Sequence, residues 1–162
     1  MPTINPLALD AQVCFALYSG EKTVNAAYRE LLEPLGLTYP QYLVMLALWE
    51  QDHVTVSMLG ARLGLDSGTL SPLLKRLEAS GLVNRRRSQE DARVVRIRLT
   101  ADGVTLRSMA LHVPAELLGR LGLEPAEAHE LRRILKKICR SGTAGPERAN
   151  NKERATNKKE TR

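Results

Sequence analysis

The feature that most constrains this chain is a stripe of leucines in a short predicted helix over residues 67–80. The stripe consists of Leu70, Leu73, Leu74 and Leu77. Their spacing of three and four residues puts apolar side chains on one side of an α-helix, so this side faces a hydrophobic core. Asp66 precedes the helix as an N-cap. Another predicted helix, Val56–Leu63, ends just before it, and the two are joined by a short turn.

Two strand-like stretches follow this pair of helices, at about residues 82–87 and 94–99, with a polar loop between them. The second stretch alternates apolar Val95, Ile97 and Leu99 with other side chains, which is typical of a half-buried strand. The order helix, turn, helix, strand, loop, strand is that of a winged helix-turn-helix. The sequence therefore predicts a mainly α fold with a small β-wing.

The side of the 67–80 helix opposite the leucines is polar and basic. It presents Ser67, Thr69, Ser71, Pro72, Lys75 and Arg76. Short hydroxyl side chains near a helix N-terminus allow close approach to a DNA major groove, and cations further along meet phosphates or guanine edges. An ordinary solvated helix surface has a similar composition, so this pattern alone leaves both interpretations open.

The wing strengthens the DNA-binding hypothesis. Residues 84–98 hold six arginines against two acidic residues, a local net charge of +4 in fifteen residues. Arginines such as Arg86 and Arg93, on or near a β-hairpin tip, suit contacts with the DNA backbone and insertion into the narrow, negative minor groove. Helix and wing together indicate a protein that binds double-stranded operator DNA.

The net charge of +6 is a weaker guide than the positions of the basic residues. Residues 142–162 hold six basic and three acidic side chains and few hydrophobic ones, so we expect a disordered basic tail there. No run approaches the roughly 18 apolar residues of a membrane-spanning helix, and we find no secretory signal. We therefore expect a cytoplasmic protein with no membrane partner.

Helical periodicity continues on both sides of the wing-bearing segment. A first helix is expected over about residues 7–32, and Thr38 begins a capping box for the next helix. Thr100 is expected to begin a helix that Pro114 bends, before a last helix over about residues 125–140.

These elements predict one domain over residues 1–141, with a DNA-binding core at about 53–103. A small helix-turn-helix reads few base pairs and gains specificity when two copies lie about 34 Å apart. We therefore expect a homodimer, held together by the helical segments 7–34 and 104–140 that flank the core.

Longer runs of the sequence resemble a known family. Residues 63–103 resemble the MarR family of winged-helix repressors; their sequence is LGLDSGTLSPLLKRLEASGLVNRRRSQEDARVVRIRLTADG. The wing of this family carries an Asp-x-Arg motif, which is Asp91 and Arg93 here. More narrowly, the runs CFALYSG at Cys14, LTYPQYLVMLALWE at residue 37 and LDSGTLSPLLKRLE at residue 65 resemble the organic-hydroperoxide-sensing OhrR subgroup.

This resemblance implies a dimeric repressor, and not an enzyme, that leaves its operator when an organic hydroperoxide oxidises the Cys14 thiolate. It also implies that Tyr28 and Tyr39 hydrogen-bond this thiolate and that Arg93 enters the minor groove. No cofactor is implied. The two cysteines of the chain have neither CxxC nor metal-ligand spacing, so no metal site is expected.

The chemistry of Cys14 can also be argued without the family. A lone cysteine on an apolar helix face is usually inert packing. A thiol with a pKa near 8.5 is only a few per cent ionised at neutral pH, so reaction with peroxide needs a helix N-terminus or hydroxyl donors that stabilise the thiolate. Tyr28 follows Cys14 by fourteen residues on the same helix face but about 21 Å away, so contact requires a second subunit.

Cys139 lies in the last predicted helix and is either a resolving thiol for Cys14 or a packing residue. A mixed disulfide with a low-molecular-weight thiol is the alternative fate of an oxidised Cys14. Three competing functions are a MarR regulator that responds to a phenolic or lipid ligand, a thiol peroxidase, and a nucleoid-type architectural protein. The peroxidase is disfavoured because the chain has no Thr-x-x-Cys or CxxC pattern.

Overall fold

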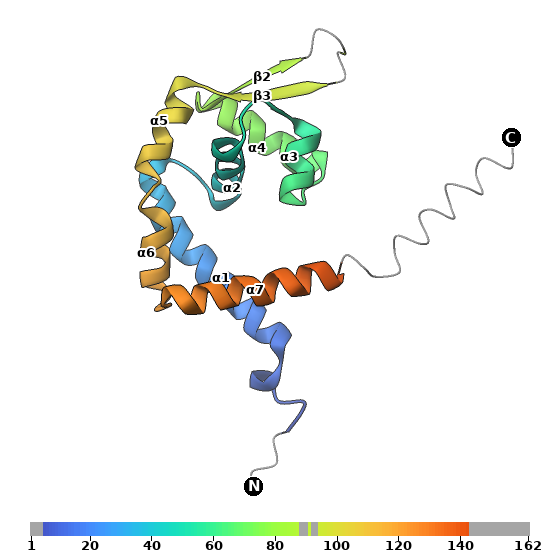
Figure 1. Cartoon of the computed structure of the whole chain (residues 1–162), viewed down its shortest axis with the longest axis vertical. Coiled ribbons are helices and arrows are strands. Elements are labelled where there is room, and N and C mark those ends of the chain that lie inside the picture. The colour runs from blue at the N-terminus through green and yellow to red at the C-terminus, as the bar shows by residue number, and fades with distance from the viewer. Residues whose placement is uncertain (1–4, 88–90, 92–93, 143–162) are drawn as a thin grey trace, which may run out of the picture. The chain divides into compact units, whose positions relative to one another are not determined.

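The computed structural model of the chain (Figure 1) describes residues 5–87, 91 and 94–142. The chain divides into two compact units, one up to Leu121 and one from Gly122 onward. The predicted wing arginine Arg93 and the predicted tail beyond residue 142 lie outside the described residues. The single domain over residues 1–141 and its dimerisation helices stay predictions.

The first unit is mainly helical and has one small antiparallel sheet. Its elements in order are η1 (Leu9–Ala11), α1 (Val13–Leu32), η2 (Glu33–Leu35), α2 (Tyr39–Glu50), β1 (Val54–Thr55), α3 (Val56–Leu63), α4 (Ser67–Ala79), β2 (Val83–Arg87), β3 (Val95–Leu99), α5 (Ala101–Met109) and α6 (Val113–Arg120). The sheet order is β1–β3–β2. The predicted class, mainly α with a small β-wing, is confirmed (Figure 1).

Side-chain caps explain where helices α2 and α4 begin. Gln41 Oε1 accepts a hydrogen bond from the Thr38 backbone N at 2.8 Å, which forms the predicted capping box of α2. Asp66 caps α4 as predicted, and its carboxylate accepts from the Thr69 backbone N at 2.9 Å. Gly64 ends α3 with a φ of 67°, a left-handed conformation that glycine adopts without strain.

The predicted start of the first helix is wrong. A helix was expected from about residue 7, but α1 begins at Val13, after a separate short turn. Gln12 has an extended backbone, and its side-chain amide donates to the carbonyls of Pro6 at 2.7 Å and Ala8 at 3.1 Å. Because this side chain bonds carbonyls that a continuous helix would use, the chain breaks here. Cys14 is therefore the second residue of α1.

The helix predicted to run from Thr100 through a bend at Pro114 is two helices instead. α5 ends at Met109, and α6 begins at Val113 with Pro114 in its first turn. Proline has a fixed φ and no N–H, so the first turn of a helix accommodates it better than a helix interior. Strand β1, only two residues long, was not predicted.

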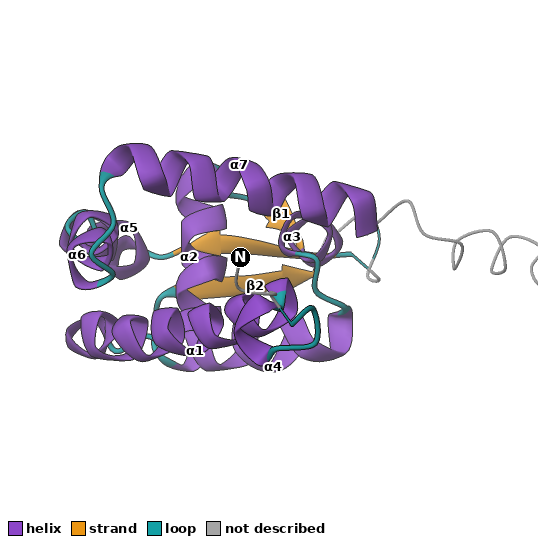
Figure 2. Cartoon of the chain, turned by 90° about the horizontal axis from the view of Figure 1, so that it is seen from below, coloured by secondary structure: helices purple, strands orange, loops and turns teal. Residues whose placement is uncertain are grey.

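The core of the first unit forms around α2, which contacts α1, α3, α4 and α5 (Figure 2). The leucine stripe of α4 faces this core as predicted, with Leu70, Leu74 and Leu77 fully buried and Leu73 half-buried. From α2, the largest fully buried side chains are Tyr42, Met45 and Leu48. Helix α4 is thus fixed to the rest of the unit by its apolar side.

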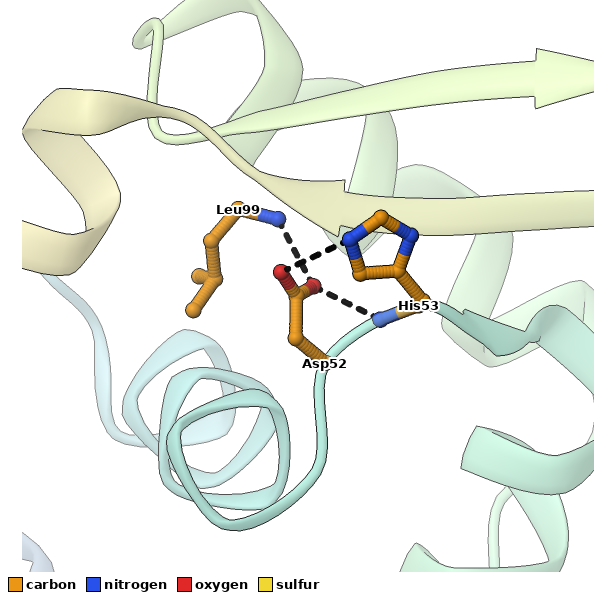
Figure 3. Close-up of polar contacts among 3 residues, drawn as sticks. All are labelled: Asp52, His53 and Leu99. Carbon is orange, nitrogen blue, oxygen red and sulfur yellow. Dashed lines mark hydrogen bonds and ion pairs between the residues drawn. The ribbon is translucent and has the colours of Figure 1, made fainter.

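The loop after α2 is tied to the end of the wing. Asp52 Oδ1 accepts hydrogen bonds from the backbone N of His53 at 2.7 Å and of Leu99 at 2.9 Å (Figure 3). His53 has a φ of 59°, in the left-handed region that few residues other than glycine adopt. The Asp52 carboxylate therefore holds a tight turn and one end of β3 together.

The second unit contains α7, Pro125–Gly142. Its large apolar side chains Leu131, Ile134 and Ile138 are exposed and recur at helical spacing. No helix within the described ranges is long and apolar enough to cross a membrane.

Candidate functional site

The outer side of α4 presents most of the predicted DNA-reading residues to solvent. Ser67, Thr69, Lys75 and Arg76 are exposed, whereas Ser71 is half-buried. Both the backbone N and the hydroxyl of Thr69 donate to the Asp66 carboxylate, at 2.9 and 3.0 Å. These hydrogen bonds hold the pKa of Asp66 below its usual range. Thr69 therefore helps to cap the helix as well as lining its outer side.

The outer face of the wing carries three exposed arginines. Arg86 on β2 lies directly opposite Arg96 on β3, and Arg98 is two residues further along the same face. Ile97 and Leu99 alternate with them and are buried on the inner face. Because these three cations share the face opposite Ile97 and Leu99, the outer side of the wing presents a strongly positive surface to a polyanion.

Arg85 is separated from this group. It lies opposite Ile97 on the inner face of the sheet and is half-buried. Its backbone N donates to the Glu78 carboxylate at 3.0 Å, which joins β2 to the C-terminal end of α4. The arginine count from the sequence alone could not divide the wing into these two faces.

Cys14 is exposed near the N-terminus of α1. The first turn of this helix contains no acidic residue, so the positive end of the helix dipole is not offset there. The apolar neighbours Leu9, Val13 and Leu17 are exposed as well. The environment of Cys14 within one chain is thus a helix end on an uncovered apolar surface.

Tyr28 and Tyr39, predicted on the resemblance as partners of the sensing thiolate, lie together. Their rings stack with centroids 4.4 Å apart at an interplanar angle of 22°. Burial, together with the neighbouring Tyr39 and Tyr42 hydroxyls, raises the pKa of Tyr28 to about 12. Burial and then Glu21 raise the pKa of Tyr39 above its usual value. Both phenols therefore keep their protons at neutral pH and are available as hydrogen-bond donors.

The structure does not bring Cys14 to these tyrosines within one chain. Both Cys14 and Tyr28 belong to α1, a continuous helix from Val13 to Leu32. Fourteen residues of α-helix span about 21 Å, which is far beyond hydrogen-bond reach. The aromatic pair is assembled in each chain, and the thiol is not part of that assembly.

Two further aromatic residues of α2 extend the tyrosine pair and were not predicted as site residues. Tyr42 lies 5.8 Å from Tyr28 between ring centroids, and Trp49 lies 6.2 Å from Tyr42 in an edge arrangement. Tyr42 and Trp49 are seven residues apart, close to two helical turns, so they share one side of α2. This spacing in the sequence could have predicted that the two rings lie close together.

A pocket of about 630 Å³ lies beside Tyr39, between α1 and α2 and the turn after α3. It is lined by Glu21, Asn25, Arg29, Leu37, Thr38, Tyr39, Pro40, Leu43, Leu63 and Leu65. The charged side chains and Asn25 come from α1, Thr38 precedes α2, and the apolar side chains come mostly from α2 and from residues 63–65. A small amphipathic molecule would fit this mixture of surfaces.

Cys139 is exposed on α7 of the second unit. Leu135, Lys136 and Arg140 line a shallow pocket beside it. Within the described part of the chain, no group of His, Cys, Asp and Glu side chains could hold a metal ion.

Comparison with known proteins identifies the family. The family model described as transcriptional regulator SarA/Rot matches residues 26–109. The organic hydroperoxide resistance transcriptional regulator of Bacillus subtilis (strain 168) is 48% identical over 113 residues, which cover 70% of this chain and 77% of that protein. The chain belongs to the MarR family of transcriptional regulators, in the OhrR subgroup.

Solved structures of other MarR-family regulators agree with this assignment. Reduced AbfR bound to DNA, a protein of Staphylococcus epidermidis, has 34% identity and a TM-score of 0.73, over 83% of this chain and 92% of that one. AbfR in its disulfide form has 36% identity and a TM-score of 0.59, over 81% and 92% of the two chains. As a MarR-family regulator the protein binds DNA, and the prediction that it is not an enzyme is confirmed.

The family model covers some of the predicted site residues of this MarR-family regulator and not others. Residues 26–109 include Tyr28, Tyr39, α4 and the described part of the wing. Cys14 and Cys139 lie outside that range, so the match to this family model does not include either thiol.

Proposed function

We propose that this MarR-family regulator is a homodimeric repressor that binds its operator while Cys14 is reduced and releases it after an organic hydroperoxide oxidises Cys14. The observation that carries the proposal is the arrangement along α1. An exposed thiol lies near its N-terminus and, fourteen residues later, the protonated Tyr28 stacks on Tyr39 of α2. A second copy whose α1 runs in the opposite direction would bring one chain's Cys14 to the other chain's Tyr28 and Tyr39.

Hydrogen bonds from these phenols would stabilise the Cys14 thiolate, the form that reacts with peroxide. The thiolate attacks the terminal oxygen of the hydroperoxide, a sulfur–oxygen bond forms and the oxygen–oxygen bond breaks. The leaving alkoxide takes up a proton and departs as an alcohol, while the sulfur, oxidised by two electrons, becomes a sulfenic acid. The tyrosines then face a neutral group and lose their strongest acceptor.

A thiol can condense with this sulfenic acid, which forms a disulfide and releases water. Cys139 or a low-molecular-weight thiol would supply it. Support for redox control comes from relatives: the Bacillus subtilis protein is named for organic hydroperoxide resistance, and AbfR has been solved both reduced on DNA and as a disulfide. Mass spectrometry of the oxidised protein will distinguish a Cys14–Cys139 bridge from a mixed disulfide.

The test is operator release, measured by fluorescence anisotropy on a DNA fragment selected from a random pool by the reduced protein. Cumene hydroperoxide should weaken binding of the wild type by about tenfold or more, in the range of strong allosteric couplings. Cys14→Ser should bind and stay bound. Cys139→Ser removes the other thiol and keeps Cys14, so it should still respond to hydroperoxide. Release of Cys14→Ser by hydroperoxide would overturn the thiol mechanism.

The pocket beside Tyr39 favours one second candidate function. A MarR regulator that responds to a phenolic or lipid ligand would use such a mixed pocket, with Cys14 as a bystander. Release of both the wild type and Cys14→Ser by a phenolic carboxylate, with no effect of hydroperoxide on either, would establish that function instead.

A further inference from the structure

Trp49 links α2 directly to the helix that follows the wing. Its indole Nε1 donates a hydrogen bond of 2.8 Å to the backbone carbonyl of Gly103, which lies 54 residues later in α5. The indole is half-buried and Gly103 is buried. A displacement of the C-terminal end of α2 would therefore be passed to the first turn of α5 through this bond.

On its other side, Trp49 ends a continuous row of packed rings. Centroid distances are 6.2 Å from Trp49 to Tyr42, 5.8 Å from Tyr42 to Tyr28 and 4.4 Å from Tyr28 to Tyr39. These separations are close to those of favourable aromatic pairs. The row thus runs from the candidate sensor tyrosines to the Gly103 carbonyl without a break.

The first residues of α5 are also fixed to both wing strands. A Cβ added at Gly103 would lie 2.1 Å from the Leu82 carbonyl oxygen, so the two backbones touch. Thr100 donates from its backbone N to Leu82 at 3.1 Å and from its hydroxyl to the Gly81 carbonyl at 2.6 Å. Leu82 precedes β2 and Thr100 follows β3, so the base of the wing is one rigid junction.

We propose that Trp49 is a positioning residue that couples the Tyr28–Tyr39 pair to the base of the wing, so that a disturbance of the tyrosines changes operator affinity. The second tie from this end of α2, the bond from Leu99 to Asp52, holds the same junction (Figure 3). The inference rests on the proposed function in one respect: oxidation of Cys14 is what disturbs the pair in the cell.

A double-mutant cycle on the reduced protein tests the coupling without peroxide. Tyr39→Ala should weaken operator binding about fivefold in the wild-type background, but less than about twofold when Trp49 is replaced by Phe, which keeps a ring and removes the N–H donor. Thr105→Val is the matched control, since it removes a hydrogen bond of α5 outside the row. Equal fold-changes of Tyr39→Ala in the wild-type and Trp49→Phe backgrounds overturn the proposal.

Trp49 is the single tryptophan of the chain, so its fluorescence gives a second measurement on the wild type. Tyr39→Ala should shift the emission maximum, because it disturbs the row that ends at the indole, whereas Thr105→Val should not. An unshifted maximum in Tyr39→Ala contradicts the proposal. If wild-type protein keeps its operator after oxidation while the cycle is still non-additive, the redox function fails and the coupling stands.

Discussion

At the scale of single residues, the Tyr28 hydroxyl has the most unusual acid–base property at the site. Its pKa is raised to about 12 by burial and by its tyrosine neighbours, against about 10 in an unfolded chain. The folded state therefore holds this proton more tightly. The resulting stability is fully present below about pH 10 and is lost as the pH rises toward about 12.

Tyr28→Phe should accordingly show a smaller loss of unfolding free energy than the wild type between pH 9 and about pH 11. Urea unfolding followed by circular dichroism measures both proteins at each pH. Tyr18→Phe is the control, since this ring lies on α1 but is 54% exposed. An identical alkaline decline in Tyr28→Phe and wild type would show that the raised pKa of Tyr28 does not affect folding.

Gly103 gives the second prediction at this scale. A methyl group there would overlap the Leu82 carbonyl, so Gly103→Ala should destabilise the protein by about 2 kcal/mol or more and lower its melting temperature by about 4 °C or more. Gly119→Ala in α6 meets nothing within 4 Å and should be neutral or slightly stabilising. Thermal unfolding of the two variants compares these effects directly.

At the scale of elements, the wing combines a structural and a binding role. Arg86 lies exposed on its outer face, directly opposite Arg96. Arg86→Ala should weaken operator binding and lower the slope of log Kd against log salt by about 1, as expected for one lost phosphate contact. Arg107→Ala removes the same charge from α5 and should leave the slope unchanged. An unchanged slope in Arg86→Ala would remove this residue from the DNA interface.

The elements that the sequence predicts well are those with local signals. The capping residues Thr38 and Asp66 predict where α2 and α4 begin, and the leucine spacing predicts the buried side of α4. The start of α1 was missed because the Gln12 side chain bonds the carbonyls of the preceding turn, which no propensity encodes.

The candidate site was predictable only in part. The roles expected of Tyr28 and Tyr39 rest on the resemblance alone, because their stacking depends on how α1 packs against α2. The Trp49–Gly103 bond joins residues too far apart in sequence for any spacing rule. The division of the wing arginines between two faces required the strand register.

At the scale of the whole molecule, exposed apolar side chains on α1 and α7 need a partner, which we propose is a second copy of the chain. Ile134→Asp places a charge within the exposed apolar stripe of α7. It should shift the protein toward monomer in sedimentation velocity runs and weaken operator binding about tenfold or more, because two reading helices no longer bind together.

Lys137→Asp on the same helix introduces the same acidic side chain outside the apolar stripe and should leave the protein dimeric. Equal sedimentation of Ile134→Asp and wild type would show that this stripe does not hold the subunits together.

The like-charged pair across β2 and β3 has a consequence for the protein without DNA. Arg86 and Arg96 repel each other in the unbound wing, which weakens the pairing of the two strands, and dissolved ions screen this repulsion. The same ions compete with the arginines for phosphate. A rise in the ionic strength of the cell should thus stabilise the pairing of β2 with β3 and, at the same time, lower the affinity of the wing for DNA.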